Sequence, residues 1–143
     1  MTASSIDPHN LQRFLIAQAP VIVQVRAELL AGRKYSHWVR FIFPQITGLG
    51  RSDTARLYAI ASRAEAAAYL AHPVLGPRLI ECTHLVNAVP GTSAEQIFGA
   101  VDAAKFRSCM TLFAAVAPEH TEFTDALQKY FHGAADAATL ERI

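Results

Sequence analysis

Apolar residues recur at helical spacing along most of the chain. Leu11, Phe14 and Leu15 fall on one helix face, and Phe106 and Met110 fall on another. Residues three or four positions apart share a face of an α-helix, whereas a strand would alternate every second residue. The pattern therefore predicts an all-α fold. We expect one compact domain over residues 1–143, with six to eight short helices and with residues 1–6 as a disordered N-terminal tail.

Capping residues and helix breakers divide these stretches. Ser and Asp side chains accept hydrogen bonds from the free N–H groups at a helix start, whereas Pro and Gly favour helix ends. Internal repeats and a Ser/Gly/Pro-rich linker are both missing, which supports a single domain. The candidate N-caps are Asp7, Ser36, Ser62, Ser93, Asp102 and Asp136, and the candidate breaks are Pro20, Gly32, Pro44, Pro73, Pro118 and Gly133.

The segment "RKYSHWVRFIFPQITGLGRSD", residues 33–53, departs from this pattern. It holds the chain's only Trp, three other aromatic residues and four Arg or Lys. A short helix is predicted through "HWVRFIF", and "QITGLGRSD" has two glycines and no periodicity, so we expect a loop that leads to a helix start near Ser52. Glycines expose backbone N–H groups, and Arg binds anions through its forked donors. The segment is therefore predicted to form half of a ligand site.

Composition excludes several classes of protein. The formal net charge of +1 gives no general attraction to nucleic acid. A secretory signal is missing, and apolar runs are too short for a membrane span, so we expect a cytoplasmic protein without membrane contact. Cys82 and Cys109 lack metal-ligand spacing and are expected to be buried thiols; a disulfide or a catalytic thiol is the less favoured reading. No metal site and no cofactor are predicted.

Nine residues are candidates for a functional site. Asp102, Lys105 and Ser108 share a helix face in an apolar stretch, and Arg40 and Arg78 also lie in strongly apolar blocks. A buried Lys is either paired or has a lowered pKa, and His37 has a near-neutral pKa suited to proton transfer. The predicted catalytic residues are Asp102, Lys105 and His37, and the predicted ligand-binding residues are Arg33, Lys34, Trp38, Gln45, Arg51 and Ser52.

Each candidate also has a purely structural interpretation. Trp38 is a typical core residue, and His37 can cap or pack. Arg33, Lys34 and Arg51 can form a solvated basic face, and Asp102 with Lys105 can be a cap and a surface pair.

Five long blocks of the chain resemble one bacterial family. They are "LQRFLIAQ", "LLAGRKYSHWVRFIFPQITGLGRSDTARLYAI", "EAAAYLAHPVLGPRLIEC", "IFGAVDAAKFRSCMTLFA" and "ALQKYFHGAADAATL". In order and over nearly the whole chain, they are similar to the family called domain of unknown function 1810, sometimes labelled calpastatin-like. The resemblance implies one mainly α-helical domain and little about activity; nothing here resembles a calpastatin repeat. Val39 and Arg40 replace the Met and Trp usual in the family, so a stacking role at position 40 is not expected.

A second resemblance rests on layout. "SRAEAAAYLAHPVLGPRL" and "AAKFRSCMTLFAAVAPEHTEFTDALQKYFHGAADAATLE", which contains the pair Lys105-Phe106, are similar in order to the NAD/ADP-ribose-associated helical domain family, whose Trp-Gly motif is missing here. This likeness implies an ADP-ribose-type ligand.

Two functions from different classes follow from these observations. In the first, the protein binds a small anionic or nucleotide-like ligand, with N-glycosidic hydrolysis of an ADP-ribose-type group as one option. In the second, it is a non-enzymatic protein-interaction domain in which Trp38, Phe41 and Phe43 form the core or an interface anchor. A homodimer is compatible with either function.

Overall fold

The computed structural model describes residues 7–143; the predicted tail, residues 1–6, lies outside the described residues. The described residues form ten helices and no strand, with a single parallel bridge between Ile46 and Ile60. The prediction of an all-α, single compact domain is confirmed. In chain order the helices are α1 (Gln12–Gln18), α2 (Ile22–Leu30), α3 (Val39–Ile42), α4 (Asp53–Leu57), α5 (Arg63–Ala71), α6 (Leu75–Ala88), α7 (Ala94–Phe98), α8 (Ala100–Val116), α9 (Thr121–Phe131) and α10 (Ala137–Leu140).

The expected number of six to eight helices was too low. The difference comes from short elements: α3, α4, α7 and α10 have four or five residues each. A helix this short completes barely one turn, so its sequence carries little periodicity. The loop that follows Pro44 was predicted correctly, and Ser52 begins α4 by accepting a hydrogen bond from Ala55 N at 3.0 Å.

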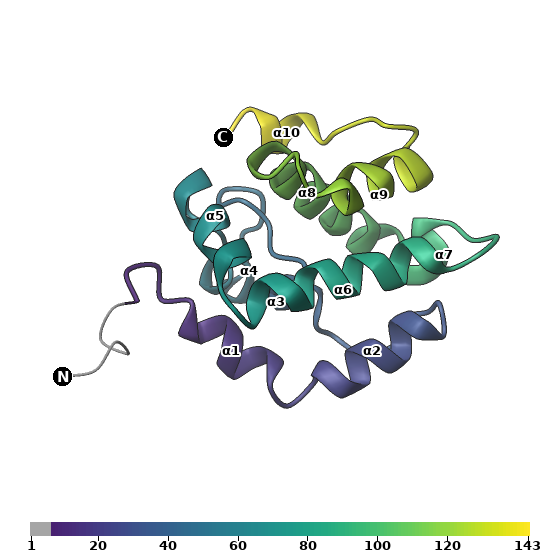
Figure 1. Ribbon diagram of the computed structural model, residues 1–143, viewed down its shortest axis with the longest axis horizontal. Coiled ribbons are helices and arrows are strands. Elements are labelled where there is room, and N and C mark those ends of the chain that lie inside the picture. Colours follow the sequence, from purple (N-terminus) through teal and green to yellow (C-terminus); the bar gives the residue numbers. More distant parts are fainter. Residues whose placement is uncertain (1–6) are drawn as a thin grey trace.

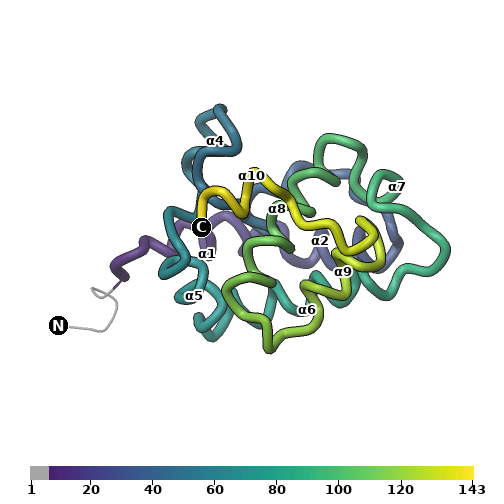
Figure 2. Tube along the Cα trace, turned by 90° about the horizontal axis from the view of Figure 1, so that it is seen from above, coloured from purple at the N-terminus to yellow at the C-terminus, as the bar shows by residue number. Residues whose placement is uncertain are grey.

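Helix α6 runs through the middle of the fold, with α2 on one side and α9 on the other (Figure 1). The longest helix, α8, packs against α9, and α10 lies across α8 at the end of the chain (Figure 2). Helices α3 and α7 also contact α8. Thus α8 contacts both the aromatic, basic segment and the C-terminal helix, and several of its polar residues line the candidate site.

A cluster of aromatic rings fixes α3, α7 and α8 to one another. The ring centroids of Phe43 and Phe106 are 4.9 Å apart and edge-on, and those of Phe98 and Phe106 are 4.8 Å apart and stacked. Trp38 lies beside both Phe43 and Phe98. Such pairs stabilise a core beyond the burial of their area. They hold the wall of the candidate site in place.

Three of the predicted caps are confirmed. Ser62 accepts from Glu65 N, and Asp136 accepts from Thr139 N. The Ser93 side chain accepts from the Gln96 N–H, and the Gln96 side chain accepts from the Ser93 N–H, so this capping box is complete.

Two other predicted caps were wrong. The Ser36 hydroxyl donates to Glu28 rather than capping a helix. Helix α8 begins before Asp102, because Gly99, at φ +82°, ends α7 and immediately precedes Ala100. Asp102 therefore stands in the first turn of α8, where its carboxylate pairs with lysines instead.

Glu28 is a buried carboxylate that organises the chain after α2. Glu28 is only 3% exposed to solvent. One oxygen accepts from Tyr35 N (2.7 Å), Ser36 N (3.0 Å) and Trp38 Nε1 (3.0 Å). The other accepts from Ser36 Oγ (2.6 Å) and Gln24 Nε2 (2.8 Å). Burying a charge is costly unless hydrogen bonds compensate it, and here five donors do so.

These bonds also set the charge of Glu28. Burial by itself would raise the pKa of the carboxyl, but the hydrogen bonds from Ser36, Tyr35 and Gln24 outweigh it and lower the pKa from its ordinary 4.5 to about 2. Glu28 is therefore ionised at neutral pH.

Substituting Glu28→Gln should remove a pH-dependent part of the stability. A carboxyl with a lowered folded-state pKa stabilises the fold above its unfolded pKa, and this contribution is lost as the pH falls through the folded value. We expect urea unfolding to show a deficit of about 2 kcal/mol at pH 7 that shrinks below pH ~4.5. Glu81→Gln, which removes an exposed pair with Arg26, is the control and should cost less than about 1 kcal/mol. A Glu28→Gln deficit that stayed constant down to pH ~3 would contradict this account.

Gly76 is required by the tight turn between α5 and α6. A Cβ added there would overlap the backbone carbonyl of Leu70, which belongs to the preceding helix. Gly76→Ala should therefore push α5 and α6 apart and destabilise the protein by about 2–3 kcal/mol in denaturant unfolding. Gly91→Ala is the matched control, since a Cβ at Gly91 meets nothing within 4 Å and suffers only from its φ of +58°. A loss in Gly76→Ala no larger than that in Gly91→Ala would contradict the importance of the close approach to Leu70.

Candidate functional site

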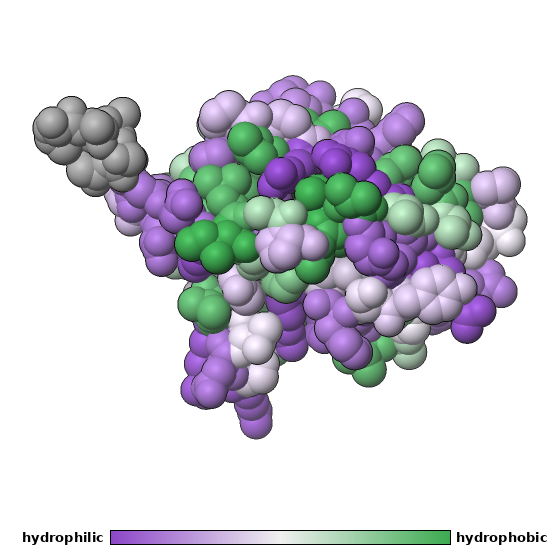
Figure 3. All heavy atoms as spheres, turned by 90° about the horizontal axis from the view of Figure 1, so that it is seen from below, coloured by the Kyte–Doolittle hydropathy of each residue, from purple (hydrophilic) through white to green (hydrophobic). Residues whose placement is uncertain are grey.

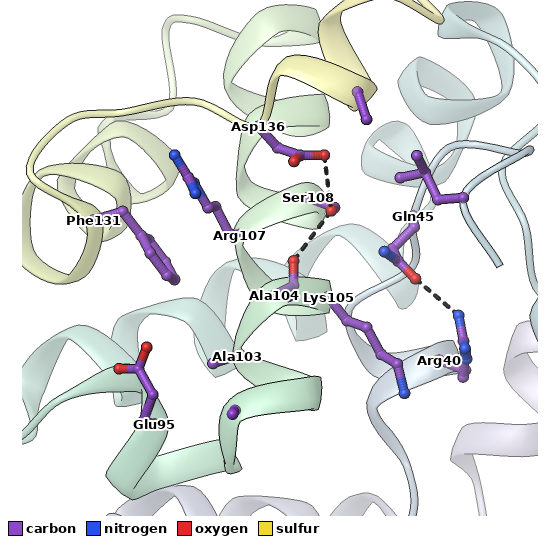
Figure 4. A pocket seen from close by; sticks show the side chains of 13 residues that line it. Arg40, Gln45, Glu95, Ala103, Ala104, Lys105, Arg107, Ser108, Phe131 and Asp136 are labelled. Carbon is purple, nitrogen blue, oxygen red and sulfur yellow. Dashed lines mark hydrogen bonds between the residues drawn. The ribbon is translucent and has the colours of Figure 1, made fainter.

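A polar hollow of about 440 Å³ opens where α8 meets the α3 segment, α7 and the C-terminal residues. Its volume lies within the roughly 300–1,000 Å³ typical of ligand pockets. Phe131 and Leu49 supply apolar lining, and Glu95 stands at its edge on α7. The other polar side chains in its wall are Arg40, Gln45, Lys105, Arg107, Ser108 and Asp136 (Figure 4).

Lys105 belongs to a lysine–carboxylate–lysine arrangement at the start of α8. Its Nζ lies 2.8 Å from one oxygen of Asp102, and the other oxygen is 2.7 Å from Nζ of Lys34. The Lys34 side chain is 6% exposed and its ammonium lies over the Trp38 ring, 5.5 Å from the centroid. One carboxylate thus serves two ammonium groups, which leaves an excess positive charge beside the cavity.

The pKa of Asp102 follows from this arrangement. Burial acts to raise it, but the hydrogen bonds and charges of Lys105 and Lys34 prevail and lower it below its ordinary value. A carboxylate with a lowered pKa is a weak proton acceptor at neutral pH. The geometry therefore supports Asp102 as the partner that holds Lys105 at the cavity.

Arg40 reaches the same cavity from α3. Its Nη1 donates to Gln45 Oε1 at 2.9 Å, so the two polar side chains orient each other. The loop passes close above: a Cβ at Gly50 would lie 2.8 Å from Arg40 Nη1 and 2.5 Å from the Ala55 Cβ. Glycine at position 50 is what allows the backbone to approach the guanidinium so closely.

The opposite side of the cavity is formed by Arg107 and the chain after α9. Arg107 donates through Nε to the carbonyl of Ala134 (2.9 Å) and through Nη2 to that of Ala135 (3.3 Å). Its guanidinium also lies over the Phe131 ring, 5.6 Å from the centroid. These contacts fix its charge at the cavity wall without neutralising it.

Asp136 joins α10 to α8 at this end. Its Oδ2 accepts from Ser108 Oγ at 3.0 Å, and from Thr139 through both Oγ1 (2.6 Å) and N (3.2 Å). Its backbone N–H donates to Thr111 Oγ1 at 2.9 Å. Asp136 is therefore fixed in position by three residues of two helices, two of which bond its carboxylate.

Of the predicted site residues, Gln45 and Lys105 line the cavity, and Asp102 is connected to it through Lys105. Trp38 is 1% exposed and bonded to Glu28, so its ring is part of the core and has no open face for a ligand. Lys34 is mostly buried in its pair with Asp102.

The remaining four predicted residues lie outside the lining of this cavity. His37 and Arg51 are exposed, and Ser52 caps α4. Arg33 lines a different, open hollow beside Tyr35, whose ring it contacts. The aromatic, basic segment thus divides between core, surface and cavity.

The sequence did not identify Arg107 and Asp136 as site residues. It singled out Arg40 only as a polar residue in apolar surroundings, and Ser108 only as sharing a helix face with Asp102 and Lys105. A partial signal existed, because Ser108 follows Lys105 by three positions on one helix. Asp136 was expected to be a cap, which it is, but its second contact to Ser108 spans 28 residues and has no local signature.

Other kinds of site find no support in residues 7–143. No group of three or more His, Cys, Asp or Glu there is placed to hold a metal ion. Cys82 and Cys109 are free and buried, as predicted, and burial raises the pKa of the Cys82 thiol to about 12, which disfavours a reactive thiolate. None of the described helices combines the length and apolar character that crossing a membrane requires.

Comparison with known proteins agrees with this description of the chain. A solved structure, the conserved hypothetical protein Rv1873 from Mycobacterium tuberculosis, is similar at a TM-score of 0.93 and 52% sequence identity, covering 94% of this chain and 96% of that one. Among curated proteins, no sequence matches. Residues 8–143 match the family described as "Protein of unknown function (DUF1810)". The chain therefore belongs to the DUF1810 family.

Proposed function

We propose that this protein binds a small anionic ligand, with phosphate as its best-fitting group, in the cavity beside α8. The observation that carries the proposal is that Arg40 of α3 lines one hollow together with Lys105 and Arg107 of α8. Cations repel one another, so their gathering on a concave surface needs a reason beyond the stability of the fold. An anion supplies that reason.

The charge balance of the cavity supports an anion. Three cations line it against two carboxylates, those of Glu95 and Asp136, and Asp136 is already engaged by Ser108 and Thr139. Among the contacts of residues 7–143, Arg40 uses one of its five N–H donors and Lys105 one of three. The unused donors can form charge-assisted hydrogen bonds with phosphate oxygens.

Binding is better supported than hydrolysis. N-glycosidic hydrolysis would need a carboxylate facing the reacting carbon, with freedom to orient water or stabilise positive charge. Asp102 has both oxygens occupied by lysines and does not line the cavity, and His37 is exposed elsewhere. A nucleotide-like ligand remains compatible, because its phosphates present the same chemistry.

The protein-interaction alternative gains less from the structure. Trp38 and Phe43 are core residues, so they do not anchor a partner. Large exposed apolar side chains do occur on α1 and α2, at Ile16, Val23 and Leu30. Seen from that side, however, apolar and polar residues are mixed over the surface (Figure 3). This mixed surface gives no indication of a particular partner.

Two arginines of the same segment test the proposal. Arg40→Met should weaken the binding of inorganic phosphate at least about tenfold, because it removes a lining cation that bonds directly to the ligand. Arg51→Met, which removes an equal charge from an exposed position outside the cavity, should change the affinity less than about twofold. Isothermal titration calorimetry at low ionic strength measures both, and circular dichroism confirms folding. Equal losses of affinity in the two variants would show that phosphate responds only to net charge, and the cavity would then not be the binding site.

Asp102→Asn tests whether Asp102 holds Lys105 as a hydrogen-bond acceptor alone or needs its negative charge to do so. If Asp102 only holds Lys105, the amide variant should bind phosphate about threefold more tightly, since a negative charge near the ligand is gone while a hydrogen-bond acceptor for Lys105 remains. The same titration measures this. Weaker binding by a folded Asp102→Asn variant would show that the ionised carboxylate is needed to position Lys105.

A further inference from the structure

The two oxygens of the Asp136 carboxylate differ in their hydrogen bonds within residues 7–143. Oδ2 takes all three hydrogen bonds, from Ser108 Oγ and from Thr139 Oγ1 and N. Within residues 7–143, Oδ1 receives no hydrogen bond and is not among the buried polar atoms that lack a partner. It therefore remains an accessible acceptor in the wall of the cavity.

The position of Asp136 relative to the cations gives the cavity two chemically different ends. Figure 4 shows Asp136 at one end and the tips of Lys105 and Arg40 at the other, with Gln45 bonded to Arg40. A phosphate fits the end with Lys105 and Arg40. The Asp136 end accepts a hydrogen-bond donor and repels a second anion.

The surroundings of Asp136 favour a neutral donor over an ammonium group. Arg107 lines the same end and is held there by the carbonyls of Ala134 and Ala135, the two residues before Asp136. A ligand ammonium would meet this fixed guanidinium as well as the carboxylate, and like charges at such a site disfavour binding. A hydroxyl donates to Oδ1 without that repulsion.

We infer that the ligand is a phosphorylated polyol, that is, a sugar phosphate or the sugar-phosphate part of a nucleotide. Its phosphate binds to Lys105 and Arg40, and one of its hydroxyl groups donates to Asp136 Oδ1. The Phe131 ring, half-buried and covered by Arg107, also lines the cavity. This inference rests on the proposed function and names the ligand class of the same site.

Three probes test it by isothermal titration calorimetry: inorganic phosphate, n-butyl phosphate and ribose 5-phosphate. The butyl ester matches the phosphate charge and offers apolar bulk without hydroxyls. We expect ribose 5-phosphate to bind about tenfold more tightly than butyl phosphate, as one added hydrogen bond to a carboxylate allows. In Asp136→Asn, which keeps an oxygen for capping α10, the preference should fall to about twofold or less.

Asp125→Asn is the matched control, because it makes the same substitution at an exposed position outside the cavity lining; this variant should keep the preference for ribose 5-phosphate. Equal affinity of the wild type for ribose 5-phosphate and butyl phosphate overturns the inference, and this comparison needs no variant, so it stands even if Asp136→Asn fails to fold. Retention of the full preference in a folded Asp136→Asn overturns it too. If inorganic phosphate does not bind, or binds equally well to Arg40→Met, the proposed function fails; if it binds and depends on Arg40, only the ligand class is in question.

Discussion

The buried carboxylate of Glu28 is the interaction on which the aromatic, basic segment depends. Its five hydrogen bonds reach Gln24 in its own helix and Tyr35, Ser36 and Trp38 in the segment that follows. A chain that leaves a helix at a glycine has many available paths, and a fully ionised acceptor inside the core selects one of them. The indole is directed inward, and the residues between α2 and α3 take a fixed course over α7, where Lys34 N donates to the carbonyl of Ile97 at 2.7 Å.

The path of the chain between α2 and α3 connects the core to the candidate site through two ion pairs. Lys34, held in place by the segment, pairs with Asp102, and Asp102 in turn pairs with Lys105 at the cavity. Each pair is partly buried, so its interaction is screened less by salt than that of an exposed pair such as Arg26 with Glu81. The position of one cavity cation is thus determined by residues that never contact the cavity, and a change at Glu28 is expected to reach Lys105 through this series of contacts.

The fold was largely predictable from the sequence because helical periodicity, caps and breakers are local. Ser62, Ser93 and Asp136 all cap where expected, and the residues after Pro44 form the expected loop. The candidate site was predictable only in part, because it depends on contacts between distant segments. Lys105 and Gln45 were identified from their types and neighbours, whereas the importance of Arg107 emerges only from its bonds to Ala134 and Ala135, 27 and 28 residues away. Glu28 was missed for a similar reason: in sequence it is one acidic residue in an ordinary amphipathic helix.

The close passage of the loop at Gly50 over the Arg40 guanidinium has a mechanical consequence. No side chain separates the Gly50 backbone from the Arg40 guanidinium, and the Ala55 side chain packs at the same place. The backbone there covers the guanidinium and restricts its rotation. An arginine restrained in this way meets an incoming anion with its rotamer already selected, so less side-chain entropy is lost on association than for a freely moving arginine. Gly50 thereby restricts the orientation of the Arg40 side chain.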